Sequence, residues 1–405
     1  MAHLVDDLKK LSPSTLWLLS ISLTFNIGSF IVVPFLAVYL HNTLGFSLAF
    51  VSVQLTLKLF SQRGLMLVGG LLSDRFGPLW VMGAGAALRI LSFFLYAWSE
   101  HELVISVASL VFGFAGALFV PASKSALSQS VIPAHKPLMF SLRSTANNLG
   151  MALGGLIGAA LIELDPLVLF ASAAGVQALS SCFLGLPPVR ALHARSAVLK
   201  AEHPGLRAPG QILGMLTNPV IVKVSLLYLV YIALYAQLEF TLPIATANTF
   251  SERTVGLLFF FNTATVFLLQ VPLNYYLGRR FSLDKMILIG FGCIALAMLG
   301  FYQVPQLLPF LALVSLYTVG EIIIDPAIDA VASAQVHDAR LGALFGLLGT
   351  AALLGGLLGN WIGAVGFVAP AGGVFWLGCA GLALLACVIQ CLPTAEWRSA
   401  RSKSP

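Results

Sequence analysis

Long apolar runs follow one another along the whole chain with only short polar breaks, and this pattern limits what the chain can fold into. A run of about 20 apolar residues is long enough to cross a bilayer as a helix. Only 9% of the 405 residues are Asp, Glu, Lys or Arg, whereas an ordinary soluble domain carries roughly 25%. So few charges cannot cover a water-facing surface, and we therefore expect a membrane protein built of helices.

The apolar runs and the polar breaks between them predict twelve membrane-spanning helices in two groups of six. The first group is expected near residues 14–40, 47–72, 79–98, 103–127, 142–162 and 167–186. The second group is expected near residues 219–245, 254–277, 284–302, 306–334, 341–365 and 372–392. We therefore predict an all-α polytopic protein with an N-terminal six-helix bundle (1–186), a cytoplasmic linker (187–215) and a C-terminal six-helix bundle (216–405).

The charges of the predicted loops indicate an orientation. Lysine and arginine gather at both termini, in the central linker and in the loops from even to odd spans. The opposite loops carry Glu100, Glu102, Glu163 and Asp165, and their only basic residue is Arg253. Because positive loops stay in the cytoplasm, we expect a multi-pass protein of the inner (cytoplasmic) cell membrane with both termini in the cytoplasm.

Composition also argues against other classes of ligand. The net charge of +6 is spread between apolar runs and forms no basic face, so nucleic acid is not an expected partner. The five cysteines lie in or beside apolar runs without metal-ligand spacing, so no metal site is expected.

The two halves of the chain look related to each other. Gly154 and Gly158 in the fifth predicted span recur as Gly355 and Gly359 in the eleventh. Pro121 in the fourth predicted span similarly matches a proline at position 326 in the tenth. Transporters are commonly built from such repeats, with the substrate site between them.

The segment from Gly70 to Gly77, which reads GLLSDRFG, lies at the end of the second predicted span. It resembles the GxxxDRxG signature of the major facilitator superfamily. In that family the segment is a gating element, and the resemblance assigns this role to Gly70, Asp74, Arg75 and Gly77. A carboxylate at a helix end suits the role because it can pair with an arginine or with the positive N-terminus of another helix.

A second segment, GMALGGLIGA from Gly150 to Ala159, is similar to a motif of the drug:proton antiporters in this superfamily. Gly150, Gly154 and Gly158 are spaced so that another helix can approach closely, either as part of a gate or in simple packing. Arg89 in the third predicted span adds to the likeness to this twelve-span multidrug-efflux branch. An arginine that the branch often carries in span four is absent, and Ser109 lies near its expected place.

Eight ionisable residues inside predicted spans are candidates for a function, because each such group costs roughly 2.5 to 3.5 kcal/mol on insertion scales. The basic ones are in the first half: Lys58, Arg63, Arg89 and Lys124. The acidic ones are in the second half: Glu239, Glu321, Asp325 and Asp329. This separation predicts a polar cavity shared between the halves.

Glu321, Asp325 and Asp329 follow one another at four-residue spacing and so share one stripe of the tenth predicted span. Three close carboxylates in poor solvent cannot all ionise cheaply, so we expect at least one to bind a proton near neutral pH. All three are proton-coupling candidates, although Asp329 also suits a simple pairing with a base. Glu239 is a fourth candidate, with an ion pair to a first-half base as the alternative.

The substrate-binding candidates are polar or aromatic residues in spans one, two, four, seven and ten. They are Asn26, Gln54, Lys58, Lys124, Tyr231, Tyr235, Gln237 and Tyr317. Gln54 and Lys58 share a helix face that also suits hydrogen bonding between helices. The basic residues of the first half leave an anionic or zwitterionic substrate open.

These features predict a proton-coupled secondary transporter that exports a small organic or amphiphilic molecule by alternating access. We expect a monomer in the lipid bilayer, with the proton as coupling ion and no further cofactor. Drugs, siderophores, metabolites and lipids all remain possible substrates.

Other functions remain open. An uptake symporter is the main alternative on the same fold, followed by a sensor that does not transport. An intramembrane enzyme is not expected, because Asp325 and Asp329 lie on one helix and GxSxG, HExxH and GxxxxGK[ST] are missing.

Overall fold

The computed structural model describes residues 11–161, 165–189, 214–250, 252–302, 306–366 and 372–393. These residues are helical apart from short connections, and no strand occurs among them. Contacts divide the chain into two units. The first unit comprises residues 2–209 and 336–350, and the second unit comprises residues 210–335 and 351–405.

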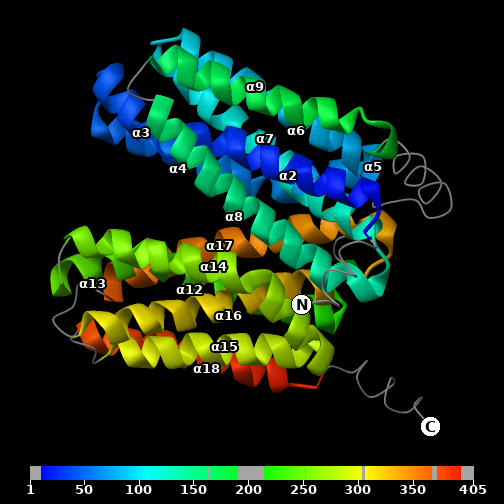
Figure 1. The fold of residues 1–405 in the computed structure, drawn as a ribbon, viewed down its shortest axis with the longest axis vertical. Helices are drawn as coiled ribbons and strands as arrows, with labels where there is room; N and C mark the ends of the chain where they lie inside the picture. Colours follow the sequence, from blue (N-terminus) through cyan, green and yellow to red (C-terminus); the bar gives the residue numbers. More distant parts are fainter. Residues whose placement is uncertain are drawn as a thin grey trace. The chain divides into compact units, whose positions relative to one another are not determined.

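The first unit contains a series of helices that follow one another along the chain (Figure 1). They are α2 (Pro13–Val32), α3 (Leu36–Val38), a π-helical turn (Tyr39–Thr43), α4 (Leu48–Gly64), α5 (Met66–Phe76), α6 (Pro78–Trp98), α7 (Glu102–Gln129), α8 (Lys136–Leu161) and α9 (Pro166–Leu184). A short 3₁₀ turn, Pro133–His135, precedes α8, and another, Asp338–Arg340, precedes α17.

The second unit is likewise helical (Figure 1). Its helices are α12 (Pro219–Glu239), α13 (Thr241–Thr249), α14 (Glu252–Arg280), α15 (Leu283–Phe301), α16 (Leu307–Ser333) and α18 (Gly372–Cys391). Helix α17 (Leu341–Gly366) belongs to both units, because its residues up to Thr350 group with the first unit and the rest with the second.

Local sequence explains where several helices begin. Ser12, Asp165 and Asn218 each cap a helix whose first residue is a proline, which lacks the N–H that would otherwise be left unpaired. The Asp165 carboxylate accepts a hydrogen bond of 2.7 Å from the backbone N–H of Leu167. Between α5 and α6 the chain turns at Gly77, whose φ of 102° favours glycine.

The core of the first unit lies between its helices. Helix α2 packs against α8 and α9, and α6 packs against α7. Large apolar and aromatic side chains fill the space, among them Phe93, Phe112 and Phe170. The hydroxyl group of Tyr96 is also buried there and bonds to that of Ser109 at 2.8 Å.

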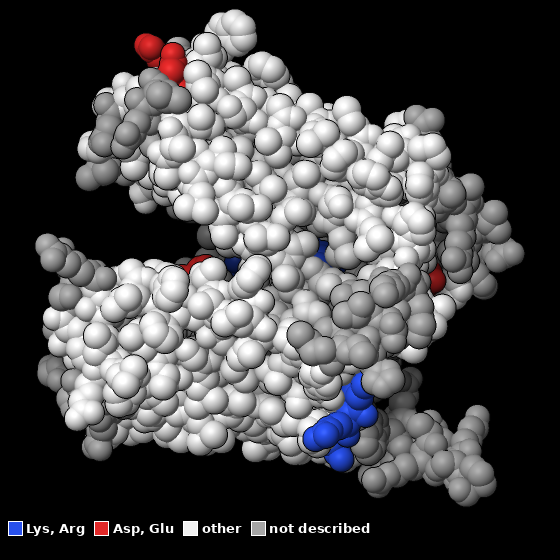
Figure 2. All heavy atoms as spheres, in the orientation of Figure 1, with Lys and Arg blue, Asp and Glu red and all other residues white. Residues whose placement is uncertain are grey.

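The outer surface is largely apolar, as expected for helices that face lipid. Many large apolar side chains are exposed, including Leu156, Leu308 and Val388. The face drawn in Figure 2 carries few Lys, Arg, Asp or Glu side chains, and its largest coloured group lies at one margin. In a water-soluble protein a continuous apolar surface of this kind would cause aggregation.

Among the described residues, ten helical segments are long and apolar enough to cross a membrane. They are Pro13–His41, Pro78–Trp98, Glu102–Gln129, Pro166–Leu184, Pro219–Thr246, Gly256–Arg280, Leu283–Phe301, Leu307–Ser333, Asp338–Gly366 and Gly373–Cys391. The other two predicted spans correspond to α4 with α5, which are separated at Leu65, and to α8. The all-helical membrane class is confirmed, and the count of twelve spans stays a prediction.

Candidate functional site

A polar cavity of about 140 Å³ lies within the first unit, among α2, α4, α6, α7 and α8. Its lining combines basic, amide and aromatic side chains. They are Phe25, Asn26, Ser29, Phe30, Val33, Lys58, Gln62, Arg89, Phe112, Phe119, Val120, Arg143 and Asn147. Three of these residues are basic, and none of the described lining residues is acidic.

Arg89 is the most deeply buried of the three basic residues, with only 2% of its surface exposed. Its guanidinium carbon lies 3.5 Å from the ring centroid of Phe112 and 5.0 Å from that of Phe25. Among the described residues, its Nε and Nη1 atoms have no hydrogen-bond partner. Cation–π contacts offer about 0.5 to 2 kcal/mol. An arginine in the membrane costs about 2.5 to 3.5 kcal/mol, so the contacts offset only part of this.

Lys58 and Arg143 bring two more positive charges to the same cavity. The Lys58 ammonium nitrogen lies 5.6 Å from the ring centroid of Phe112, so Lys58 and Arg89 share one aromatic ring. Arg143 lies near the start of α8 and is buried. The charges of Lys58 and Arg89 repel each other across this ring, which favours the binding of a negative group.

Amide side chains complete the cavity wall. The Asn26 amide nitrogen donates to the Asn147 side-chain oxygen at 2.9 Å, which links α2 to α8. Gly116 makes room for the arginine, because a Cβ there would lie 3.0 Å from Arg89 Nη2 and 3.1 Å from the Gln62 side chain. The cavity is therefore shaped by small and amide residues around a fixed guanidinium.

The acidic candidates of the second unit lie along α16. Glu321 accepts a hydrogen bond of 3.3 Å from the Asn262 amide, which also donates to Thr318 at 2.8 Å. The Tyr228 hydroxyl lies 3.5 Å from an Asp325 carboxylate oxygen. Asp329, two turns beyond Glu321, is buried, with 1% of its surface exposed.

Aromatic residues of α12 and α16 accompany these carboxylates. The ring centroids of Tyr228 and Tyr231 are 5.9 Å apart, and those of Tyr231 and Tyr235 are 6.2 Å apart. The Tyr317 hydroxyl is buried and has no hydrogen-bond partner among the described residues. A row of hydroxyl groups beside carboxylates is able to bind a polar ligand or to move a proton.

The Asp74 carboxylate holds the first turn of α17 within the first unit. Its two oxygens accept hydrogen bonds of 2.8 Å from the backbone N–H groups of Gly342 and Ala343. The backbones of Gly70 and Gly342 touch directly, since a Cβ on either glycine would collide with the carbonyl oxygen of the other. Arg75, by contrast, is exposed beside the Phe76 ring.

The glycines of α8 pack on the backbone of α2. A Cβ at Gly150 would lie 2.8 Å from the Leu23 carbonyl oxygen, and one at Gly154 would lie 2.6 Å from that of Ile27. Gly158 has the same relation to the carbonyl of Ile31. Three successive helix turns therefore meet without side chains between them.

The same packing recurs in the second unit. Gly355 of α17 lies against the carbonyl oxygen of Leu229 in α12. A Cβ at Gly359, one turn later, would lie 2.5 Å from the Ala233 carbonyl oxygen. Thus α17 meets α12 in the second unit as α8 meets α2 in the first, which supports the internal repeat read from the sequence.

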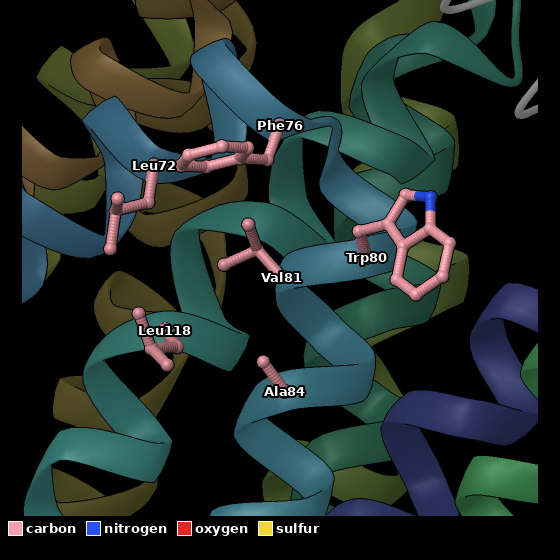
Figure 3. Close-up of a pocket in the computed structure, with 6 residues that line it drawn as sticks. All are labelled: Leu72, Phe76, Trp80, Val81, Ala84 and Leu118. Atoms are coloured by element: carbon pink, nitrogen blue, oxygen red, sulfur yellow. The ribbon is translucent and has the colours of Figure 1, made fainter.

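A larger depression of about 450 Å³ opens on the side of α5, α6 and α7 (Figure 3). Its lining is apolar: Leu72, Phe76, Trp80, Val81, Ala84 and Leu118. Trp80 and Phe76 are more than half exposed there. Exposed aromatic residues near helix ends are typical of the membrane interface, so this depression needs no specific ligand to explain it.

The sequence model that describes the Major Facilitator Superfamily matches residues 18–250, which is more than half of the chain. The chain belongs to the major facilitator superfamily. It is therefore a transporter of this family, and the resemblance to the multidrug-efflux branch is confirmed.

Curated relatives within the superfamily support that branch. The multidrug resistance protein MdtH of Aeromonas hydrophila subsp. hydrophila is 26% identical over 85% of this chain and 85% of its own length. MdtH of Salmonella typhi is 25% identical over 83% of both chains. Matches of this length show that the likeness extends over most of the chain.

Solved structures of superfamily members share the fold. The human organic anion transporter MFSD10 has a TM-score of 0.70 and 17% identity, covering 93% of this chain and 99% of its own. The proton:xylose symporter XylE has a TM-score of 0.73 and 15% identity, covering 93% of this chain and 94% of its own. A bacterial homologue of ferroportin has a TM-score of 0.75. At these identities the likeness concerns the fold alone.

Within this superfamily fold, some residues predicted from the sequence lie together and others do not. Asn26, Lys58 and Arg89 line the cavity of the first unit. Gln54 lies elsewhere and donates to Ser106 on α7 at 3.0 Å. Arg63 is half-buried in the last turn of α4 and is not part of the cavity lining.

The remaining candidates are spread over other positions. The Lys124 ammonium nitrogen lies 5.5 Å from the ring centroid of Phe345. Gln237 donates to the backbone carbonyl of Gly359 at 2.8 Å and so joins α12 to α17. Glu239 is exposed at the end of α12. Their roles in binding or coupling stay predictions.

Sequence reasoning missed most residues of the cavity lining, among them the polar residues Arg143 and Asn147. Arg143 falls just inside the predicted fifth span, so its charge was a usable signal. Asn147 lies one helix turn beyond Arg143, on the same face of α8.

Proposed function

We propose that the protein is a proton-coupled exporter of small organic molecules that works by alternating access. In this proposal twelve helices in two six-helix bundles cross the cytoplasmic membrane, with both termini in the cytoplasm and the protein acting as a monomer. Family membership and the multidrug resistance relatives support transport of a small organic molecule. The proton is the coupling ion, and no further cofactor takes part.

The observation that carries the proposal is the setting of Glu321 and Asp325. Among the described residues their hydrogen-bond partners are an amide and a phenol, and no lysine or arginine lies within ion-pair distance. A carboxylate that is not held in an ion pair is available to exchange a proton. A group that takes up a proton on one side and releases it on the other supplies the coupling.

The energetics are sufficient for export. One proton that moves down a potential of 100 mV releases about 2.3 kcal/mol, which supports a substantial concentration ratio before any pH difference is added.

The experiment first identifies a transported compound by comparing drug susceptibility and exported metabolites between cells with and without the gene. That compound is then used in proteoliposomes with an acidic interior. We expect accumulation of the compound by the native protein. Glu321→Gln and Asp325→Asn should each reduce proton-driven accumulation about tenfold or more while leaving exchange without a gradient measurable.

A matched control separates this effect from a general loss of charge. Glu102 is exposed at the start of α7, and Glu102→Gln should leave accumulation unchanged. If both α16 variants keep full coupling, the carboxylate assignment is wrong. Inside-out membrane vesicles separate export from uptake: an exporter accumulates the compound when the lumen is acidified, whereas a symporter releases it.

A further inference from the structure

The cavity of the first unit is chemically matched to a negative group. Lys58, Arg89 and Arg143 line a space of about 140 Å³, and no carboxylate belongs to the described part of its lining. A cationic ligand would meet the like charges of Lys58 and Arg89 there. A neutral ligand would leave the buried guanidinium without compensation.

The surroundings of the Arg89 guanidinium indicate which ligand group would bind beside it. Its guanidinium lies over the rings of Phe112 and Phe25. Its Nε and Nη1 atoms are buried without a partner among the described residues, and the residue itself lines the cavity. The buried guanidinium is therefore only partly compensated by the described residues, which favours a negative group beside it.

The rest of the lining suits the organic part of such a ligand. Phe25 and Phe119 are stacked at 3.6 Å between ring centroids, and Phe30 and Val33 add further apolar surface. The amides of Asn26 and Asn147 supply polar contacts beside the basic groups. The lining therefore offers basic and amide groups together with apolar surface.

We propose that this cavity binds the anionic group of the transported molecule, so that the substrates are organic anions or zwitterions. The inference rests on the proposed function, because it names the substrate class of that transporter. Its test is an equilibrium measurement without a proton gradient, and it therefore succeeds or fails separately from the coupling experiment.

The probe is 1-naphthoate, with 1-naphthamide as an uncharged compound of nearly the same shape. Binding of each to the purified full-length protein in neutral detergent is followed by fluorescence titration. We expect naphthoate to bind about tenfold more tightly or better, as hydrogen bonds to charged groups predict. Equal binding of the two compounds would overturn the proposal.

Variants of the lining residues test whether the preference for naphthoate over naphthamide arises in this cavity. Arg89→Gln and Lys58→Gln should each remove most of the preference for naphthoate, and Arg89→Lys should keep part of it because the charge remains. Arg280→Gln is the matched control, since Arg280 is exposed at the end of α14 and far from this cavity along the chain. Size-exclusion profiles confirm folding, and Lys58→Gln carries the test if the Arg89 variants do not fold. A preference that survives in folded variants of this cavity contradicts the proposal.

An anionic lipid headgroup presents the same charge, so the titration is repeated with phosphatidylglycerol added. Naphthoate binding that persists assigns the cavity to a soluble organic anion. Complete displacement by phosphatidylglycerol, with no displacement by phosphatidylcholine, assigns it to a headgroup and overturns the substrate role.

Discussion

The carboxylate of Asp74 accepts a hydrogen bond of 2.8 Å from the backbone N–H of Gly342, although the two residues are 268 positions apart. A second bond joins Asp74 to the next N–H of α17. The first N–H groups of a helix have no partner within it, and they carry the positive end of its dipole. An acid from α5 therefore does for α17 what an N-cap residue does for its own helix.

Replacing Asp74 by Asn should weaken this contact, because the amide keeps one acceptor but loses the charge. We expect a loss of stability of about 0.3 to 2 kcal/mol, together with reduced transport. The measurement is thermal unfolding in detergent by size-exclusion fluorescence, paired with a transport assay. Asp165→Asn is the control, because Asp165 caps its own helix and Asn caps about equally well. Equal effects at both positions would argue against a special role for Asp74.

Two neighbouring glycines of α8 should respond in opposite directions to alanine. At Gly154 the added Cβ would lie 2.6 Å from the Ile27 carbonyl oxygen, so α2 and α8 must move apart. At Gly155 the added Cβ would meet open space, and alanine favours helix by up to about 1 kcal/mol. We expect Gly154→Ala to lower thermal stability and Gly155→Ala to preserve or raise it. A loss at Gly155 as large as at Gly154 would contradict the packing described for this helix pair.

Gly77 should be sensitive for a conformational reason. Its φ of 102° is a backbone geometry that costs other residues about 1 to 3 kcal/mol. Gly77→Ala should therefore reduce thermal stability and disturb the angle between α5 and α6. Gly278→Ala in α14 is the control, because a Cβ at position 278 would have no atom within 4 Å. Similar melting temperatures for the two variants would show that the turn tolerates a side chain.

The helices and their class were predictable because lipid imposes a simple rule on the sequence. Apolar runs must be long enough to span the bilayer, and prolines and capping residues mark where several of them begin. The second predicted span was harder to read, since Leu65 separates α4 from α5 and neither half is long enough alone. The fifth predicted span corresponds to α8. This helix begins at Lys136 and also contains Arg143, and these two charges lower its mean hydropathy.

The candidate site was only partly predictable, because periodicity gives a helix face but not the neighbour of that face. Gln54 and Lys58 share a face of α4, yet Gln54 bonds to Ser106 while Lys58 lines the cavity. Arg143 and Asn147 also line the cavity, and they lie on α8, whose glycine motif predicted only close packing with another helix. Whether a side chain lines the cavity or bonds to another helix depends on residues that are far away in the sequence. A single sequence does not show which of these residues become neighbours.

The proline in α16 leads to the last prediction. Pro326 has no N–H, so the carbonyl of Ile322 loses its partner within the helix. The Asn274 amide of α14 donates to this carbonyl at 2.7 Å, between the turns that carry Glu321 and Asp325. The side chain thus satisfies the group that the proline leaves free.

Asn274→Ala should therefore cost about 1 to 3 kcal/mol, because a buried carbonyl loses its donor. Pro326→Ala restores the N–H and makes the Asn274 bond redundant, so the double variant should lose less than the sum of the two single variants. Unfolding of all four proteins in detergent gives the coupling free energy directly. Strict additivity would mean that Asn274 and Pro326 act independently, and the carbonyl of Ile322 would then not be what connects them.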